Sequence, residues 1–224
     1  MILAEQSALE FFDGATAGFF VEVGVSHPTL ESQSWPLEQA GWTGALVEAQ
    51  PDLAAFLVAS RSAKVFAVAC SAPDKAGGSL SLRVSHPQSG PGRAADASAT
   101  HYTVLVPVRT LDSILEEAEA PIPIDFLSIN AGGHVLQALS GFDFARWQPY
   151  LVALRRTGGG LKAHRHLRQA GYHLIRCGGE TDWYTPGDLD VPVAWRQRWA
   201  NVRQLYLGWP LRVLGHAMQR LRRR

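Results

Sequence analysis

The 224-residue sequence has only two cysteines and no long apolar run. Cys70 and Cys177 lie far apart without metal-binding spacing, which excludes a disulfide framework and favours free thiols in a reducing compartment. No apolar stretch reaches the ~18 residues that a transmembrane helix needs. The first residues, MILAEQSALEFFDG, include acids and lack the basic region that opens a signal peptide. We therefore expect a cytoplasmic protein.

Acidic residues are absent from the last part of the chain. Residues 191–224 contain eight arginines and no aspartate or glutamate. Because the whole chain carries a formal charge of +1, residues 1–190 carry −7. This asymmetry predicts an acidic globular domain over residues 1–190 and a basic tail over residues 191–224, and it suggests that the tail contacts a partner.

The tail also has apolar residues at helical spacing. Trp195, Trp199, Val202 and Tyr206 recur with arginines between them, which predicts an amphipathic helix. Such a helix packs on its own domain or in a homodimer, contacts a paralogous protein, or docks peripherally on an anionic membrane surface. Nucleic acid is not expected as a partner, because the acidic body would repel phosphate.

Strand-like and helix-like segments alternate in the first third of the chain. Strands are predicted at Phe19–Gly24, Gly44–Glu48 and Lys64–Cys70, with helices at Leu30–Ala40 and Pro51–Ser60 between them. Proline suits the first position of a helix because its missing N–H has no partner to lose there. Short β-α-β-α-β connections indicate a parallel sheet with right-handed crossovers.

The rest of the chain continues this pattern. Helices are predicted over Leu111–Ala120, capped by Thr110, and over Leu161–Ala170, ended by Gly171. Further strands are predicted at Ser79–Val84, His101–Val108, Ile124–Asn130, Pro149–Leu154, Tyr172–Cys177 and Trp183–Thr185. The predicted fold class is α/β, with a Rossmann-like, doubly wound, mostly parallel sheet.

Two acids close the first two predicted strands. Glu22 precedes Gly24, where a glycine lets a ligand approach the backbone, and Glu48 ends the second strand. A carboxylate at the second position accepts hydrogen bonds from ribose hydroxyls in nucleotide-type sites. The alternative is ordinary structure, namely a turn glycine and an exposed loop acid. The spacing of the two features supports a cofactor pocket as much as it does this alternative, so both interpretations stay open at this point.

The segment IDFLSINAGGHV, residues 124–135, is predicted to be a strand that leads through a glycine turn into a helix. Open α/β sheets place ligands at such strand ends. The turn contains Asn130, Gly132, Gly133 and His134 but no acid. His134 is the candidate base of this turn, and the alternative is a histidine that only hydrogen-bonds backbone.

These segments together resemble S-adenosylmethionine-dependent methyltransferases of the FkbM type over most of residues 7–190. The segments that carry the resemblance are FFVEVGVSHP, SQSWPLEQAGWTGALVEAQPDL, VRTLDSIL, IDFLSINAGGHV and HRHLRQAGYHLIRCGGETDWYTP. The resemblance implies a class I methyltransferase fold with S-adenosylmethionine as cofactor. It places Glu22, Gly24, Ser26, Glu48 and Asn130 in the cofactor pocket, with Cys70 and Ser71 near the adenine side.

The sequence departs from the family pattern where acids are expected. The family block Asp-x-Glu-Gly-His-Glu reads Asn-Ala-Gly-Gly-His-Val here, so Asn130, Gly132 and Val135 replace its three acids. Divalent metals that prefer oxygen ligands need carboxylates, so we expect no metal. Methyl transfer to a hydroxyl usually needs a base, and only His134 remains.

These departures lead to three hypotheses. The first is a catalytically impaired pseudo-methyltransferase that binds a ligand or a partner. The second is an active S-adenosylmethionine-dependent O-methyltransferase acting on a sugar or small-molecule hydroxyl, because alignment alone contributes much of the rate of methyl transfer. The third is a structural subunit of an intact paralogue.

A pair of arginines follows the fifth core strand, where the family tends to carry an acid. Arg155 and Arg156 are candidates for binding the phosphate or carboxylate of a substrate or partner. The alternatives are that they solvate a loop or pair with the acids of a partner chain.

Overall fold

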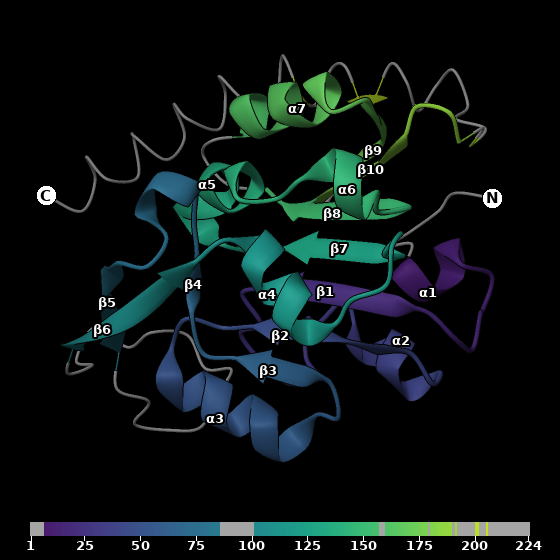
Figure 1. Ribbon diagram of the computed structural model, residues 1–224. Helices are drawn as coiled ribbons and strands as arrows, with labels where there is room; N and C mark the ends of the chain where they lie inside the picture. Colours follow the sequence, from purple (N-terminus) through teal and green to yellow (C-terminus); the bar gives the residue numbers. More distant parts are fainter. Residues whose placement is uncertain are drawn as a thin grey trace, which may run out of the picture.

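The computed structural model describes residues 7–85, 101–156, 160–178, 180–189, 191, 200–201 and 205. Its main element is a seven-stranded sheet in the order β3-β2-β1-β7-β8-β10-β9 (Figure 1). The strands are β1 Phe19–Val23, β2 Thr43–Val47, β3 Lys64–Phe66, β7 Phe126–Ile129, β8 Leu151–Arg155, β9 Tyr172–Gly178 and β10 Thr181–Pro186. Only β10 runs against its neighbours, so the sheet is mostly parallel and compatible with a Rossmann-like fold.

Helices cover both faces of this sheet because its central strands are apolar on both sides. In β1 all five residues are buried. Phe19, Val21 and Val23 join one core cluster, which includes residues of α4, α5, α6 and α7, whereas Phe20 joins a second cluster with residues of α1, α2 and α3. These helices are α1 Ala8–Phe11, α2 Trp35–Gln39, α3 Pro51–Ser60, α4 Leu111–Ala118, α5 Val135–Ser140, α6 Phe144–Trp147 and α7 Gly160–Gln169.

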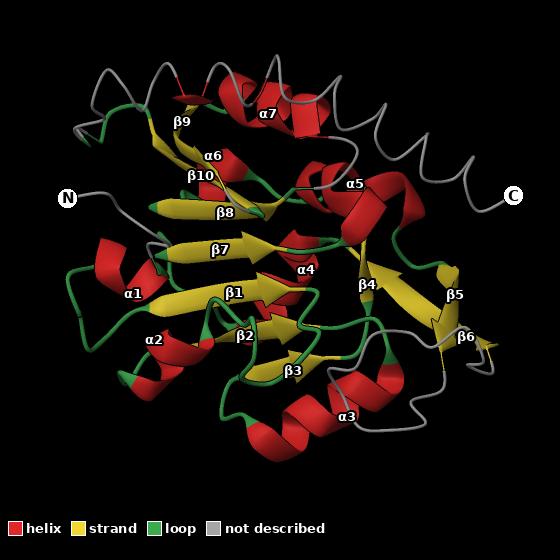
Figure 2. Ribbon diagram, turned by 180° about the vertical axis from the view of Figure 1, so that it is seen from behind, coloured by secondary structure: helices red, strands yellow, loops and turns green. Residues whose placement is uncertain are grey.

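A second sheet lies beyond the carboxyl ends of β1, β2 and β7 (Figures 1 and 2). It consists of β4 Ala69–Cys70, β5 Ser79–Ser85 and β6 His101–Arg109, in the order β4-β6-β5. Two one-turn 3-10 helices, η1 Pro73–Lys75 and η2 Gly132–His134, lie on the connections. The predicted strands at Ser79–Val84 and His101–Val108 are confirmed, and they form this separate layer.

One predicted strand is two strands in the structure. The sequence predicted a single strand over Lys64–Cys70, but β3 pairs with β2 of the main sheet and β4 pairs with β6 of the small sheet. The chain changes sheets between Phe66 and Ala69, and Ala69 packs in a separate cluster with Val106 and Val108. Apolar periodicity cannot locate such a change, because both halves belong to one continuous, mostly apolar run.

The predicted helix at Leu30–Ala40 is also wrong at its beginning. The α-helix spans only Trp35–Gln39, and Leu30 is 61% exposed. The Glu22 carboxylate accepts hydrogen bonds from the backbone N–H groups of Gln33 and Ser34. These contacts hold the segment as a loop, so tertiary contacts override its helical pattern.

The predicted division into a domain of residues 1–190 and a tail of residues 191–224 remains a prediction, because most of the tail lies outside the described residues. One described part of it contacts the main sheet. The side chain of Asn201 accepts a hydrogen bond from Cys177 N–H at 2.8 Å and donates one to the Ile175 carbonyl at 3.2 Å. Residue 201 is therefore attached to β9, the edge strand.

Candidate functional site

A cavity of about 980 Å³ lies at the carboxyl ends of β1 and β2, between the two sheets. Its volume is within the range of small-molecule and cofactor sites, roughly 300–1,000 Å³. The structure brings seven of the sequence-predicted residues together in its lining: Gly24, Ser26, Glu48, Cys70, Ser71, Asn130 and His134. Apolar residues of both sheets, including Val47 and Leu82, complete the wall.

The cavity lies at the point where the strand order reverses. The chain moves from β1 outward to β2 and β3, and then returns to the other side of β1 as β7. Helix connections therefore diverge between β1 and β7, which opens a crevice at their carboxyl ends. Gly24 and Asn130 follow these two strands directly and lie at this crevice.

Gly24 and Asn130 are held by backbone hydrogen bonds. Gly24 N–H donates to the Val47 carbonyl and Asn130 N–H donates to the Val23 carbonyl, each at 2.8 Å. Gly24 has φ of +79°, and a Cβ there would lie 2.0 Å from the Asn130 carbonyl oxygen. Glycine is required at this position by both conformation and space.

Glu48 is a buried carboxyl group in the wall of the cavity. It is only 8% exposed, and its Oε1 accepts a hydrogen bond from Gln50 N–H at 2.8 Å. Burial raises the pKa of Glu48 to about 7, although hydrogen bonds from Gln50 and Ala49 act in the opposite direction. Burial makes the ionised form of this side chain unfavourable, so its carboxylate is a good acceptor for ligand hydroxyls.

Glu22 does not line this cavity but a small hollow beside it. Its carboxylate accepts hydrogen bonds from the hydroxyls of Ser32 and Ser34, at 2.7 and 2.5 Å, in addition to the two from the backbone. Arg61 in turn donates to Ser34 Oγ at 2.9 Å and pairs with Glu38. In this structure Glu22 organises the loop that follows β1.

Cys70 and Ser71 lie at the end of β4, on the small-sheet side of the cavity. Cys70 is a free thiol. Burial raises the pKa of Cys70 to about 12, and the nearby Arg109 offsets this only in part. The thiol is therefore protonated at neutral pH and is a poor nucleophile, so it contributes polarisable surface to the wall rather than chemistry.

The turn after β7 forms the opposite wall of the cavity. The Asn130 side-chain amide donates to the Gly24 carbonyl at 3.3 Å. His134 is exposed at the end of η2, and no side-chain partner is found for it among the described residues. Val135 is buried at the start of α5, where it packs in the core. His134 is thus the residue of this turn that can exchange a proton at the cavity.

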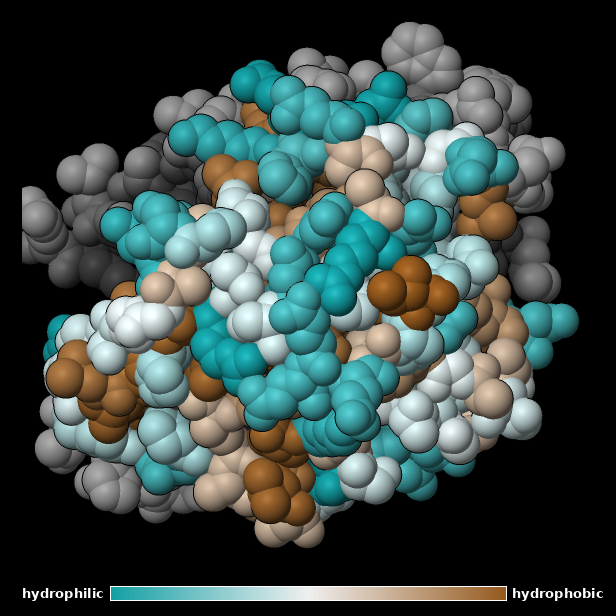
Figure 3. All heavy atoms as spheres, in the orientation of Figure 1, coloured by the Kyte–Doolittle hydropathy of each residue, from teal (hydrophilic) through white to brown (hydrophobic). Residues whose placement is uncertain are grey.

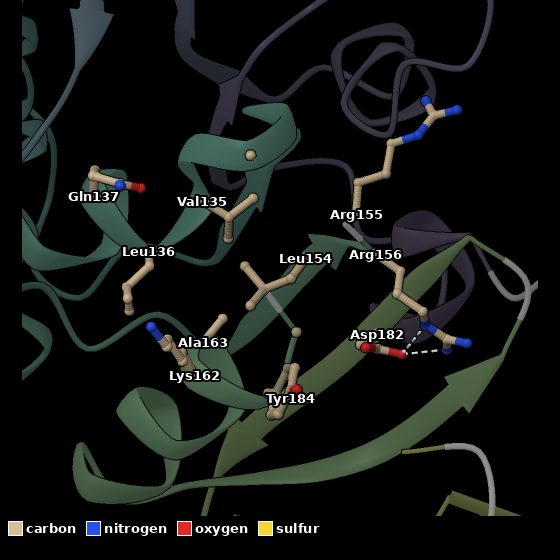
Figure 4. Close-up of a pocket in the computed structure, with 12 residues that line it drawn as sticks. Val135, Leu136, Gln137, Leu154, Arg155, Arg156, Lys162, Ala163, Asp182 and Tyr184 are labelled. Carbon is tan, nitrogen blue, oxygen red and sulfur yellow. Dashed lines mark hydrogen bonds and ion pairs between the residues drawn. The ribbon is translucent and has the colours of Figure 1, made fainter. Parts of the chain in front are cut away.

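Arg155 and Arg156 line a second cavity, of about 290 Å³ (Figure 4). Arg156 forms an ion pair with Asp182 of β10, whose side chain is 6% exposed. Hydrogen bonding and charge from Asp182 raise the pKa of Arg156, against the lowering that burial alone would cause. Arg155 pairs with Glu31, at 3.2 Å, and with Glu180.

Sequence reasoning missed several residues of the second cavity. Lys162 and Tyr184 line it together with Asp182. Lys162 was assigned only to a helix and Tyr184 only to a strand, and Asp182 directly precedes that predicted strand. Nothing in their local pattern marks them. Asp182 and Tyr184 lie beside β8 because β10 inserts between β8 and β9, and Lys162 comes from α7. The acid in the lining of the second cavity is thus Asp182 of β10, whereas the turn after β7 contributes none.

The described part of the chain contains no cluster of three or more histidine, cysteine or acidic side chains suited to a metal ion. None of its helices has the length and apolar character needed to cross a bilayer. On the face shown in Figure 3, hydrophilic and hydrophobic residues are interspersed in small groups.

Comparison with protein families gives one match. A family model for the methyltransferase FkbM domain matches residues 20–174, which is more than half of the chain. The match begins in β1 and ends in β9, so it includes the whole first cavity. A comparison with curated proteins found no match.

Proposed function

Because the chain belongs to the FkbM methyltransferase family, we propose that it binds S-adenosylmethionine in the cavity between the two sheets. The observation that carries the proposal is the meeting of Gly24, Glu48 and Asn130 at one cavity, at the reversal of strand order. This is where class I methyltransferases of Rossmann type bind their cofactor.

Five of the predicted residues in the lining have direct roles in this proposal. Glu48 accepts hydrogen bonds from the ribose hydroxyls, and Gly24 and Ser26 let the amino-acid part approach the backbone. Cys70 and Ser71 flank the adenine. Glu22 acts indirectly, through the loop it holds. When bound, the cofactor supplies an electrophilic methyl group on a sulfonium.

We propose further that catalysis of methyl transfer to a hydroxyl is impaired. General-base catalysis contributes roughly 10²–10⁴-fold to such reactions. Asn130 cannot take a proton, Glu48 is engaged by ribose, and Val135 is buried. On this proposal the protein acts as a ligand-binding or partner subunit with a methyltransferase fold.

An active O-methyltransferase is the second candidate, favoured by the position of His134. Its imidazole lines the same cavity as the cofactor-binding residues. The unprotonated ring nitrogen of an imidazole can accept a proton from an acceptor hydroxyl. Alignment of acceptor and methyl group would supply the rest of the rate.

Isothermal titration calorimetry with S-adenosylmethionine and S-adenosylhomocysteine tests the binding proposal. Saturable binding is expected, and Glu48→Gln should weaken it about tenfold, since it removes a charged acceptor. Glu119→Gln makes the same chemical change at an exposed site outside the cavity and should leave the affinity unchanged. Absence of binding at millimolar ligand would refute the proposal.

A turnover assay separates the two candidates. Candidate sugar and small-molecule hydroxyl acceptors are incubated with labelled cofactor, and S-adenosylhomocysteine is measured. Binding without turnover supports the impaired protein. Turnover that falls at least tenfold in His134→Gln, with unchanged cofactor affinity, supports the active enzyme.

For the basic tail we propose contact with a partner. The first candidate is a second copy of the chain, and the others are a paralogue and an anionic membrane surface. We also propose that the protein resides in the cytoplasm. The charge asymmetry supports this. Arginines 220 and 222–224 can be replaced by glutamine without removing Asn201, which contacts β9. Light scattering should then show a smaller assembly, whereas an unchanged mass would exclude a charge-dependent oligomer.

A further inference from the structure

The second cavity adjoins the first one at the carboxyl ends of β7 and β8. Gln137 of α5 lines both cavities, and Arg155 lines both the second cavity and the small hollow beside Gly24. A ligand in the second cavity would therefore lie next to one in the first. The volume of the second cavity, about 290 Å³, is at the lower end of the range for small-molecule sites.

The centre of the second cavity is apolar. Val135, Leu154 and Ala163 line it, and each is at most 5% exposed. Tyr184 adds an aromatic ring that is 1% exposed. Such a surface gains free energy by covering the hydrocarbon part of a ligand.

The edges of the cavity are basic. Figure 4 shows Lys162 and Arg156 on opposite sides of Leu154 and Tyr184. With Arg155, the lining contains three cationic side chains and one acid, Asp182. An excess of cations beside an apolar surface favours an organic anion as ligand.

The three cations are not equally available to a ligand. Arg156 is held by Asp182, whose side chain is 6% exposed. Arg155 pairs with Glu31 and Glu180, whose side chains are 68% and 76% exposed. Exposed ion pairs are weak, so an incoming anion can compete for Arg155. Lys162 has no ion pair within the described residues and is available without competition.

We propose that the second cavity binds the second ligand of this domain, an organic molecule that carries a phosphate or carboxylate. Lys162 and Arg155 bind the anionic group, and Val135, Leu154 and Tyr184 contact the apolar body. The inference rests on the proposed function in one respect, that the first cavity holds the cofactor. In an active enzyme the bound molecule is the methyl acceptor.

Calorimetric titration with three small probes tests the ligand class. Phenyl phosphate, benzoate and benzyl alcohol share an aromatic body and differ in charge. Phenyl phosphate or benzoate should bind at least tenfold more tightly than benzyl alcohol, and the tighter of the two identifies the anionic group. The affinity should fall as salt rises from 50 to 300 mM, since the contact is electrostatic. Equal affinities for all three probes would overturn the inference.

Variants of α7 locate the anion contact. Lys162→Gln should weaken binding of the anionic probe roughly fivefold or more, whereas Lys162→Arg should retain it. Arg165→Gln removes the same charge from an exposed position of the same helix that does not line the cavity. It should bind like the wild type. An unchanged affinity in Lys162→Gln, or an equal loss in Arg165→Gln, would reject Lys162 as the contact.

S-adenosylhomocysteine is titrated into the same variants. Lys162→Gln should keep its affinity for this ligand, because Lys162 lies outside the first cavity. Cofactor binding without probe binding would overturn only the present inference. Probe binding without cofactor binding would instead refute the proposed function and leave a basic ligand site of another kind.

Discussion

The carbonyl oxygen of Asn130 lies 2.0 Å from the position that a Cβ on Gly24 would occupy. The two residues follow neighbouring parallel strands, and the hydrogen bonds of both backbones fix this approach. The floor of the candidate cofactor cavity is therefore a rigid backbone contact that admits only glycine at residue 24.

Gly24→Ala should lower the free energy of unfolding by about 3 kcal/mol or more, because it combines left-handed strain with a clash against backbone that cannot rotate away. Gly77→Ala is the control. Gly77 has a similar φ of +80° but nothing within 4 Å of the position of an added Cβ. Gly77→Ala should therefore lower the free energy of unfolding by only about 1 kcal/mol. Urea unfolding of both variants measures the difference, and equal losses would contradict the clash.

Glu48 should make the free protein less stable as pH rises. Its pKa is 4.5 in an unfolded chain and about 7 in the folded one. Between these values the unfolded state loses a proton that the folded state keeps, so stability falls through this window and levels off above it. The free energy of unfolding of Glu48→Gln should therefore equal that of the wild type at pH 4 and exceed it by up to about 3 kcal/mol at pH 8. Thermal unfolding at both pH values tests this, and a constant difference would contradict it.

Binding of S-adenosylhomocysteine should strengthen as pH rises from 6 to 8. Ribose hydroxyls donate hydrogen bonds to the ionised form of Glu48. The ionised fraction of Glu48 rises as the pH approaches and passes its pKa of about 7. Calorimetry across this range measures the slope, and Glu48→Gln should remove it. A slope that persists in this variant would assign the titration to another group.

Glu22→Gln distinguishes a loop-holding residue from a cofactor ligand. The carboxylate accepts four hydrogen bonds from residues 32–34. Weakening these charge-assisted bonds should lower stability by roughly 1–3 kcal/mol and also reduce cofactor affinity. A loss of affinity with unchanged urea unfolding would show instead that Glu22 contacts the cofactor directly.

The ion pair of Arg156 and Asp182 should be strongly coupled. Arg156→Gln alone leaves a carboxylate that is 6% exposed without its cation, which should cost about 3–5 kcal/mol. The double variant Arg156→Gln with Asp182→Asn should recover a large part of this loss. A double-mutant cycle from urea unfolding gives the coupling, and purely additive losses would contradict it.

The sequence predicted the fold class well because apolar periodicity and turn chemistry are local properties. The strand at Phe19–Gly24, the helix that Pro51 begins and the Thr110 cap all appear within a residue or two of their predicted bounds. The same patterns were misleading where distant contacts decide the conformation. The Glu22 carboxylate holds residues 32–34 out of a helix, and Lys64–Cys70 is divided between two sheets.

By itself, then, the sequence determined the alternation of strands and helices, the family, and the group of residues at the carboxyl ends of the first strands. Parallel strands end at one edge of a sheet, so these residues could be expected to meet. Only the tertiary structure decided what surrounds them. Glu22 is occupied by its own loop, burial raises the pKa of Glu48 to about 7, and Asp182 and Lys162 join Arg156 at a second cavity. Burial and long-range pairing depend on strand order, which no local pattern contains.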